Sequence, residues 1–262
     1  MAATTASDGW PKYEAMMSEL FLPGVPADLV RVSLDRAGGN ELASGKFASP
    51  ESSAALAANG FGWFIERPSL LPAFPGLDDI EWPAASVEIE RQMRFPWQGG
   101  RHPWLDAAVV TGTHLIGVES KRFEPFRDRK QAVLAQAYDR DVWGEAMEPW
   151  LAMRDALRKD PFSYRHLDAA QLVKHAFGLS TEARRVSRAP VLLYLYAEPP
   201  RVPASARSEH RAEIEVFSAA VRDARVRFAA TSWADWLARF AAPAVPPTVT
   251  AHAEALRLKF QP

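Results

Sequence analysis

The chain has 262 residues, of which 48% are hydrophobic and 24% are charged, and its formal net charge is −1 at pH 7. The absence of cysteine excludes disulfides and thiolate metal sites, and the near-neutral charge excludes a basic surface spread over the whole chain. The first ten residues have no signal-peptide pattern, and the longest apolar run, 189–197, is too short to span a bilayer. We therefore expect a cytoplasmic protein with no membrane partner.

The first predicted elements are a helix and a strand. Ser49, Pro50 and Glu51 have the composition of a helix start, with Ser49 as the N-cap, and predict a helix that runs to about Phe64. Apolar and polar residues alternate over 87–95, which predicts a strand. In a regular strand its apolar positions share one side: Val87, Ile89, Met93 and Phe95.

Residues 103–122 predict a β-hairpin around the two-residue loop Gly112-Thr113, where glycine in the first position suits a type II′ turn. With that loop, Asp106 lies opposite Glu119, and Lys121 projects from the same face as Glu119 because side chains alternate along a strand. The other face of the hairpin is apolar and can pack in a core: Ala107, Val109, Ile116 and Val118.

The second half of the chain is mostly helical in pattern. Apolar spacings of three and four predict helices over 145–159 and 167–179. They are followed by a buried strand, a helix, a strand, a short helix capped by Ser232 and a last helix, over 190–197, 206–225, 226–231, 232–240 and 250–260. This order predicts an α/β (α+β) fold in a single domain over 1–262, with a core at about 48–240 and N- and C-terminal extensions packed on it.

The predicted hairpin register has a chemical consequence. Directly opposed like charges destabilise a sheet, because their Cβ atoms are only about 5 Å apart. A bound cation would offset the repulsion between Asp106 and Glu119, and two carboxylates beside an ammonium can hold a hard metal and position a water for attack on a phosphodiester. The alternative is a structural salt-bridge cluster, but two buried acids balanced by one lysine leave a charge uncompensated.

The arrangement of Asp106, twelve further residues and then Glu119-Ser120-Lys121 resembles the Asp…(Asp/Glu)-x-Lys signature of the PD-(D/E)xK nuclease superfamily. Leu105 precedes Asp106 where the signature has proline, which is a departure. Three other segments resemble a restriction-endonuclease-like branch of bacterial proteins: 52–61, 95–104 and 171–175. The resemblance implies a restriction-endonuclease-like core, a mixed β-sheet flanked by helices, and assigns Asp106, Glu119 and Lys121 as catalytic.

The metal ligands implied by this resemblance are Asp106 and Glu119, with Glu90 on the preceding strand as the preferred third acidic residue. Basic residues cluster around the hairpin, and a local basic face can guide a polyanion. Three of them are expected to contact nucleic acid, with a solvated charged surface as the alternative: Arg101, Arg122 and Arg127. His166 and His175 lack the spacing of a zinc-binding helix and are interpreted as structural.

The sequence thus predicts a nucleic-acid phosphodiester hydrolase that depends on Mg²⁺ or Mn²⁺, with a DNA endonuclease of restriction-endonuclease type as the first choice. Lys121 would orient or deprotonate the attacking water and stabilise charge on the phosphate. The expected partner is nucleic acid, DNA in the first place, and a homodimer is compatible with this class. The alternative is a non-catalytic nucleic-acid-binding protein with a degenerate or structural site. A hydrolase acting on a neutral substrate would leave Lys121 unexplained.

Overall fold

The structure is a computed structural model that describes residues 19–38, 40–129 and 131–262. At its centre lies one mixed sheet whose strand order follows the chain: β1 (Ser86–Gln92), β2 (Trp104–Val110), β3 (His114–Lys121), β4 (Ala189–Tyr196) and β5 (Arg227–Ser232). The first three strands pair antiparallel, and β4 and β5 join parallel to β3. The C-terminal ends of β3, β4 and β5 therefore meet at one edge of the sheet.

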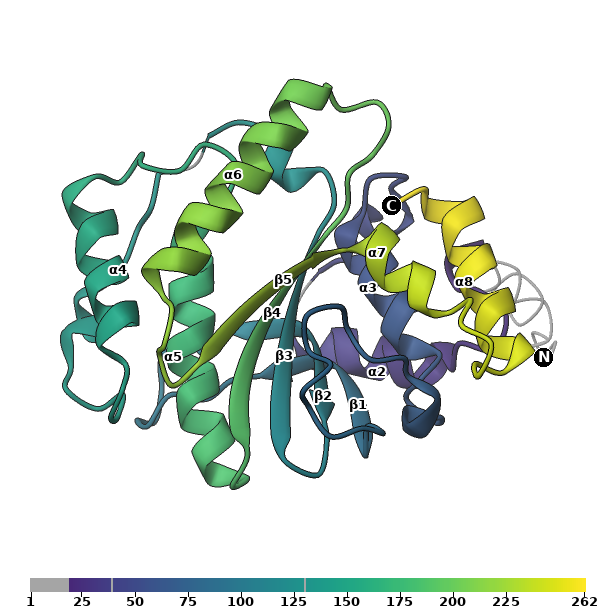
Figure 1. Ribbon diagram of the computed structural model, residues 1–262, viewed down its shortest axis with the longest axis horizontal. Coiled ribbons are helices and arrows are strands. Elements are labelled where there is room, and N and C mark those ends of the chain that lie inside the picture. Colours follow the sequence, from purple (N-terminus) through teal and green to yellow (C-terminus); the bar gives the residue numbers. More distant parts are fainter. Residues whose placement is uncertain (1–18, 39, 130) are drawn as a thin grey trace, which may run out of the picture.

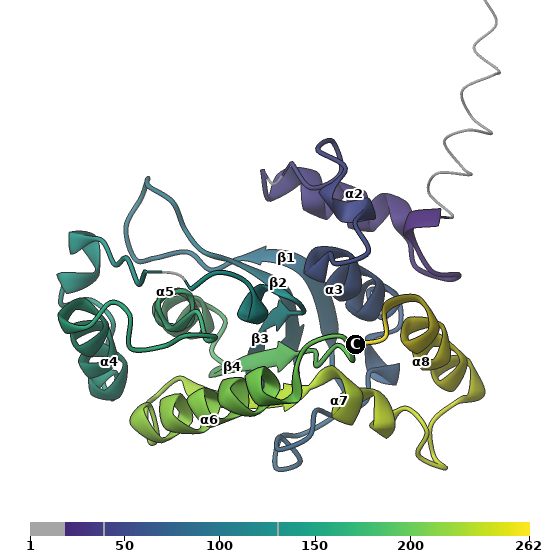
Figure 2. The same cartoon turned by 90° about the horizontal axis from the view of Figure 1, so that it is seen from above.

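Two groups of helices cover the two faces of the sheet (Figure 1). One face carries α2 (Ala27–Arg36), α3 (Ser53–Gly62), α7 (Trp233–Arg239) and α8 (Pro247–Phe260). The other face carries α4 (Glu148–Lys159), α5 (Ala169–Arg185) and α6 (Ala204–Ala220). Figure 2 shows the same separation from above. The predicted fold class, an α/β fold with a mixed sheet flanked by helices, is confirmed.

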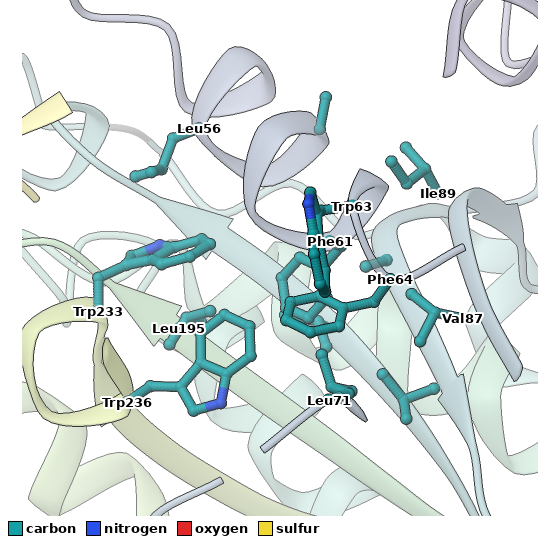
Figure 3. Close-up of a cluster of buried hydrophobic side chains, with 14 of the residues drawn as sticks. Leu56, Phe61, Trp63, Phe64, Leu71, Val87, Ile89, Leu195, Trp233 and Trp236 are labelled. Carbon is teal, nitrogen blue, oxygen red and sulfur yellow. The ribbon is translucent and has the colours of Figure 1, made fainter. Parts of the chain in front are cut away.

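Aromatic rings fix α3 between the sheet and α7 (Figure 3). Phe61 of α3 stacks on Trp236, with ring centroids 4.9 Å apart, and meets the edge of the Trp233 ring at 5.9 Å. Burial of such rings is a large favourable contribution to folding. The Trp233 indole also donates a hydrogen bond to Ser120 Oγ on β3 at 3.1 Å. The same core therefore holds the end of β3 that carries the predicted site.

The start of α3 differs from the prediction, whereas the start of α7 agrees with it. The N-cap of α3 is Ser52, whose side chain accepts a hydrogen bond from the Ala55 N–H at 3.0 Å, so Ser49 as the N-cap is wrong. Residues 49–51 form a bend and turn before the helix, and the Pro50 carbonyl accepts a hydrogen bond from Arg122. Ser232 caps α7 as predicted.

The hairpin of β2 and β3 has the predicted register but a different turn. The observed pairs include Ala107 with Val118 and Val109 with Ile116, and these side chains lie in the core beneath α3. A type II′ turn requires a positive φ at Gly112, which this residue does not have, so the predicted turn type is wrong. Thr111 Oγ1 accepts hydrogen bonds from the N–H groups of Thr113 and His114 and closes the turn instead.

Strand β1 changes faces in its middle, which the sequence pattern did not indicate. Glu90 has a φ of 52°, and the ladder between β1 and β2 skips the pair Glu90–Asp106. Before this point the apolar side chains lie in the core beneath α3, and after it they lie in the core beneath α5: Val87 and Ile89, then Met93 and Phe95. The prediction that all four share one side is wrong, because the left-handed residue inverts the alternation.

Candidate active site

Three predicted site residues lie together where β2 begins and β3 ends. Lys121 Nζ is 2.5 Å from Glu119 Oε1. The Asp106 carboxylate accepts a hydrogen bond from the Ser120 N–H at 2.6 Å. The paired ladder of the hairpin ends at Ala107, the residue next to Asp106, so the Asp106 side chain continues the link between the strands in place of the backbone. The structure therefore places Asp106 directly beside the Glu119-Ser120-Lys121 segment.

Helix α5 adds a side chain that the sequence interpretation missed. His175 Nε2 lies 3.0 Å from Glu119 Oε2, and both side chains are only 3% exposed. Among the described residues, no other group forms a hydrogen bond with the His175 ring nitrogens. The available signal was its position on the apolar face of the helix, three residues after Leu172 and four before Leu179, since that face packs on the sheet. His175 is therefore part of the cluster and not an isolated core residue.

His166, the other histidine interpreted as structural, has its hydrogen-bond partners outside this cluster. Its Nδ1 is 2.8 Å from the Pro125 carbonyl oxygen, and its Nε2 is 3.3 Å from Glu209 Oε2. These contacts tie the segment before α5 to the segment after β3 and to α6.

Glu119 and Lys121 form an ionised pair. Burial alone would raise the pKa of Glu119, but the neighbouring Lys121 and His175 lower this pKa to about 2. Burial alone would lower the pKa of Lys121, but the carboxylates of Glu119 and Asp106 raise it above its usual range. At neutral pH the carboxylate of Glu119 and the ammonium of Lys121 are therefore both charged, and they face each other with little exposure to solvent.

The other two acids of the cluster bind their protons more tightly than usual. Burial and the charge of Glu119 raise the pKa of Asp106 well above its ordinary range, and the proximity of Glu90 contributes in the same direction. Burial and the charge of Glu119 likewise raise the pKa of Glu90 to about 7. Crowded carboxyl groups with raised pKa values are typical of functional sites, and a cation between them would relieve the repulsion.

The donors of this cluster fit a hard divalent cation. Mg²⁺ is usually held by one or two carboxylates together with waters and substrate phosphates. Asp106 and Glu119 supply such a pair, because a carboxylate oxygen can accept more than one contact. Within the described ranges, no group of three or more His, Cys, Asp or Glu side chains is arranged to hold a metal ion. An ion held by Asp106 and Glu119 would therefore need water and substrate oxygens as its remaining ligands.

The three predicted nucleic-acid contacts have different environments. Arg122 is 5% exposed, and its guanidinium donates to the backbone carbonyls of Pro50 and Phe260. Arg127 is exposed in the segment that follows β3 and donates to Glu51 at 2.9 Å. Arg101 is exposed in the loop between β1 and β2. The burial of Arg122 favours a role in holding the chain together, whereas Arg101 and Arg127 remain available at the surface.

A cavity opens beside Lys121, between the segment after β3 and the start of α5. Its polar lining includes Lys121, Glu124, Asp128, Arg165, His166 and Tyr194. Glu124 accepts hydrogen bonds from Ser53 Oγ at 2.5 Å and from the Arg122 N–H at 2.8 Å. These bonds tie the beginning of α3 to the end of β3 and leave the Lys121 ammonium at the wall of the cavity.

The mixed sheet, with an acid–lysine cluster on its central hairpin, is consistent with the restriction-endonuclease-like class that the sequence resembles. A family model described as "Restriction Endonuclease associating with ARP" matches residues 4–259. The chain belongs to this family. No curated protein and no solved structure was found to match it. In the part of the chain that the structure describes, no helix has the length and apolar character needed to cross a membrane.

Proposed function

We propose that this protein is a nuclease that hydrolyses phosphodiester bonds in nucleic acid with Mg²⁺ or Mn²⁺, and that its substrate is DNA. The observation that carries the proposal is the contact of Asp106 with the segment that presents Glu119 and Lys121, beside which burial and the charge of Glu119 raise the pKa values of Asp106 and Glu90. Membership of a family described as restriction endonucleases supports the same activity.

Each side chain has a role that follows from its environment. Asp106 and Glu119 would hold the ion, which supplies Lewis-acid polarisation of the phosphate and a more acidic water. Lys121 stays protonated because Glu119 and Asp106 raise its pKa, so it orients the attacking water and stabilises negative charge that develops on the phosphate oxygens. Glu90 has a pKa of about 7, which suits a group that exchanges a proton with that water near neutral pH.

His175 acts as a positioning residue in this proposal. Its contact with Glu119 at 3.0 Å occupies one carboxylate oxygen, while Lys121 occupies the other. Both partners are nearly fully buried, so the carboxylate has little freedom to rotate. This arrangement keeps Glu119 in one orientation towards Asp106 before metal and substrate bind.

The test is cleavage of plasmid DNA, single-stranded DNA and RNA with Mg²⁺, with Mn²⁺ and with a chelator. Glu119→Gln and Lys121→Met should each reduce metal-dependent cleavage by about 10²-fold or more, while affinity for the substrate at low salt stays within a few-fold of the parent. Glu88→Gln is the matched control, because it removes one acid from the same sheet outside the cluster. Cleavage by Glu119→Gln at the parent rate would place the activity elsewhere.

One observation favours the alternative of a non-catalytic nucleic-acid-binding protein. Both carboxylate oxygens of Glu119 already have cationic or imidazole partners, as they would in a structural ion pair. In that case the parent binds nucleic acid and never cuts it with either metal, and Mg²⁺ leaves its melting temperature unchanged. A rise in melting temperature with Mg²⁺ that is absent in Asp106→Asn supports the nuclease.

A further inference from the structure

A groove rich in positive charge lies beside the strand end that carries the candidate active site. Its lining includes three cationic side chains and two aromatic ones: Arg122, Arg201, Lys259, Phe123 and Phe260. None of the described residues that line this groove is an aspartate or a glutamate. Figures 1 and 2 both place the C-terminal end of α8 close to the start of α3, at the edge where β3 and β4 end. We call this feature the cationic groove.

The charge of Arg122 has no carboxylate directly against it. Its terminal nitrogens donate to backbone carbonyls, and its Nε has no partner in the described part of the chain. Glu51 and Glu124 act on it electrostatically, but neither forms a salt bridge with it among the described residues. Carbonyl oxygens accept hydrogen bonds from the guanidinium, and the carbonyl groups at the end of α8 carry a partial negative charge. A buried cation of this kind is costly unless a counter-charge is supplied.

The other two cations of the groove are also short of negative partners. Lys259 Nζ donates to the carbonyls of Glu19 and Leu20, at 2.6 and 3.0 Å. Arg201 shares the carboxylate of Glu51 with Arg127, so that one acid serves two guanidinium groups. Arg201 is also 59% exposed, and its guanidinium lies over the Phe123 ring at 4.1 Å. The groove therefore presents an excess of positive charge at the surface.

We infer that the cationic groove binds a phosphate group of the nucleic acid whose bond is cut at Lys121. The inference rests on the proposed function, since it names a second contact of the same substrate. Arg122 follows Lys121 directly in the chain, so the cavity that Lys121 lines and the groove that Arg122 lines lie at the same end of β3. A nucleic-acid strand that crosses this end of β3 can therefore contact both, with Arg201 and Lys259 on the phosphate and the buried positive charge of Arg122 behind them.

The experiment measures binding of a short 3′-labelled single-stranded oligonucleotide, without divalent metal, over a series of salt concentrations. The variant is Arg201→Gln combined with Lys259→Gln. The matched control is Arg222→Gln combined with Lys159→Gln, which removes the same charge from exposed positions on the α4 and α6 side. The groove variant should bind about tenfold more weakly, and the slope of its salt dependence should flatten by about 0.7 units, the value for one lost phosphate contact on a single strand. The control should stay within about twofold of the parent.

Two arms distinguish the source of the phosphate. If a 5′-phosphate strengthens binding over a 5′-hydroxyl in the parent and not in the groove variant, the groove holds a terminal phosphate. If the two strands bind the parent equally and the variant weakly, it holds an internal phosphodiester. Melting temperatures verify that each variant is folded, and Arg201→Gln alone carries the test if Lys259→Gln loosens the contact with Glu19.

The inference is overturned if the groove variant binds as tightly as the control, even when the parent cleaves its substrate. Conversely, the parent protein could fail to cleave any substrate while the groove variant still binds more weakly and with a flatter salt dependence. That result would refute the nuclease activity and leave the phosphate site in place. The two outcomes are therefore distinguishable in the same set of proteins.

Discussion

Replacing Glu90 by glutamine tests whether burial and the neighbouring charge of Glu119 disfavour the ionised form of this carboxyl group. Burial and the charge of Glu119 raise the pKa of Glu90 from 4.5 to about 7. A carboxyl whose pKa is raised by folding binds its proton more tightly in the folded than in the unfolded protein. The ionisation of Glu90 therefore leaves the free energy of unfolding unchanged below pH 4.5 and lowers it as the pH rises from 4.5 to 7. Above that range the free energy of unfolding stays reduced.

The shift in pKa sets the size of the effect. One unit corresponds to about 1.4 kcal/mol, so the change from 4.5 to about 7 amounts to about 3 kcal/mol of unfolding free energy lost by pH 8. Glutamine has the shape of the protonated carboxyl and cannot ionise. Glu90→Gln should therefore be more stable than the parent by about 3 kcal/mol at about pH 8, and by less than about 1 kcal/mol at about pH 5.

Urea denaturation at these two pH values, with a chelator present, measures the difference. Glu88→Gln on the same strand is the control, because its partly exposed pair with Arg91, at 2.8 Å, contributes at most about 1 kcal/mol. Equal changes in stability at both pH values, or a loss of stability in Glu90→Gln at about pH 8, would show that Glu90 is not held in a buried site beside the charge of Glu119. The placement of a third acid in the cluster would then be refuted.

Three further substitutions test other parts of the argument. Asp106→Asn should raise the melting temperature slightly and abolish metal-dependent cleavage, because it removes a carboxyl group whose pKa is raised by burial and by Glu119. A loss of several kcal/mol in the free energy of unfolding would instead identify Asp106 as a structural ion-pair partner. His175→Leu leaves a buried oxygen of Glu119 unpaired and should cost about 1–3 kcal/mol in urea denaturation, whereas His175→Gln keeps a donor and should cost less; equal losses would contradict the contact. Burial lowers the pKa of His252 to about 4, so as the pH falls the unfolded chain binds the proton before the folded protein does. The parent should therefore lose about 3 kcal/mol of unfolding free energy as the pH falls from 6.5 to 4. His252→Phe keeps a ring that can stack on Trp63, and its melting temperature should fall less than that of the parent over the same pH range. The same pH profile in the variant and the parent would refute this reasoning.

By itself the sequence determined how the central hairpin pairs. Two apolar runs joined by a two-residue loop can pair in one register that places the apolar side chains of both strands on the same face, where they form a core. A slip by one residue would expose these side chains to solvent. The observed pairs, such as Val109 with Ile116, follow that register. The placement of Glu119 and Lys121 on one face required only the alternation of a strand. Local chemistry also determined the start of α7 at Ser232.

Only the tertiary structure decided what surrounds that hairpin. The inversion at Glu90 lets β1 and the segment that follows it pack into different cores, and no local pattern reports which core a side chain will enter. The contact of His175 with Glu119 exists because α5 packs on that face of the sheet, and Arg122 is buried because α8 ends against it. Each of these partners is far away along the chain. Spacing in the sequence is informative within a helix or a hairpin, whereas contacts between elements depend on how the folded layers pack.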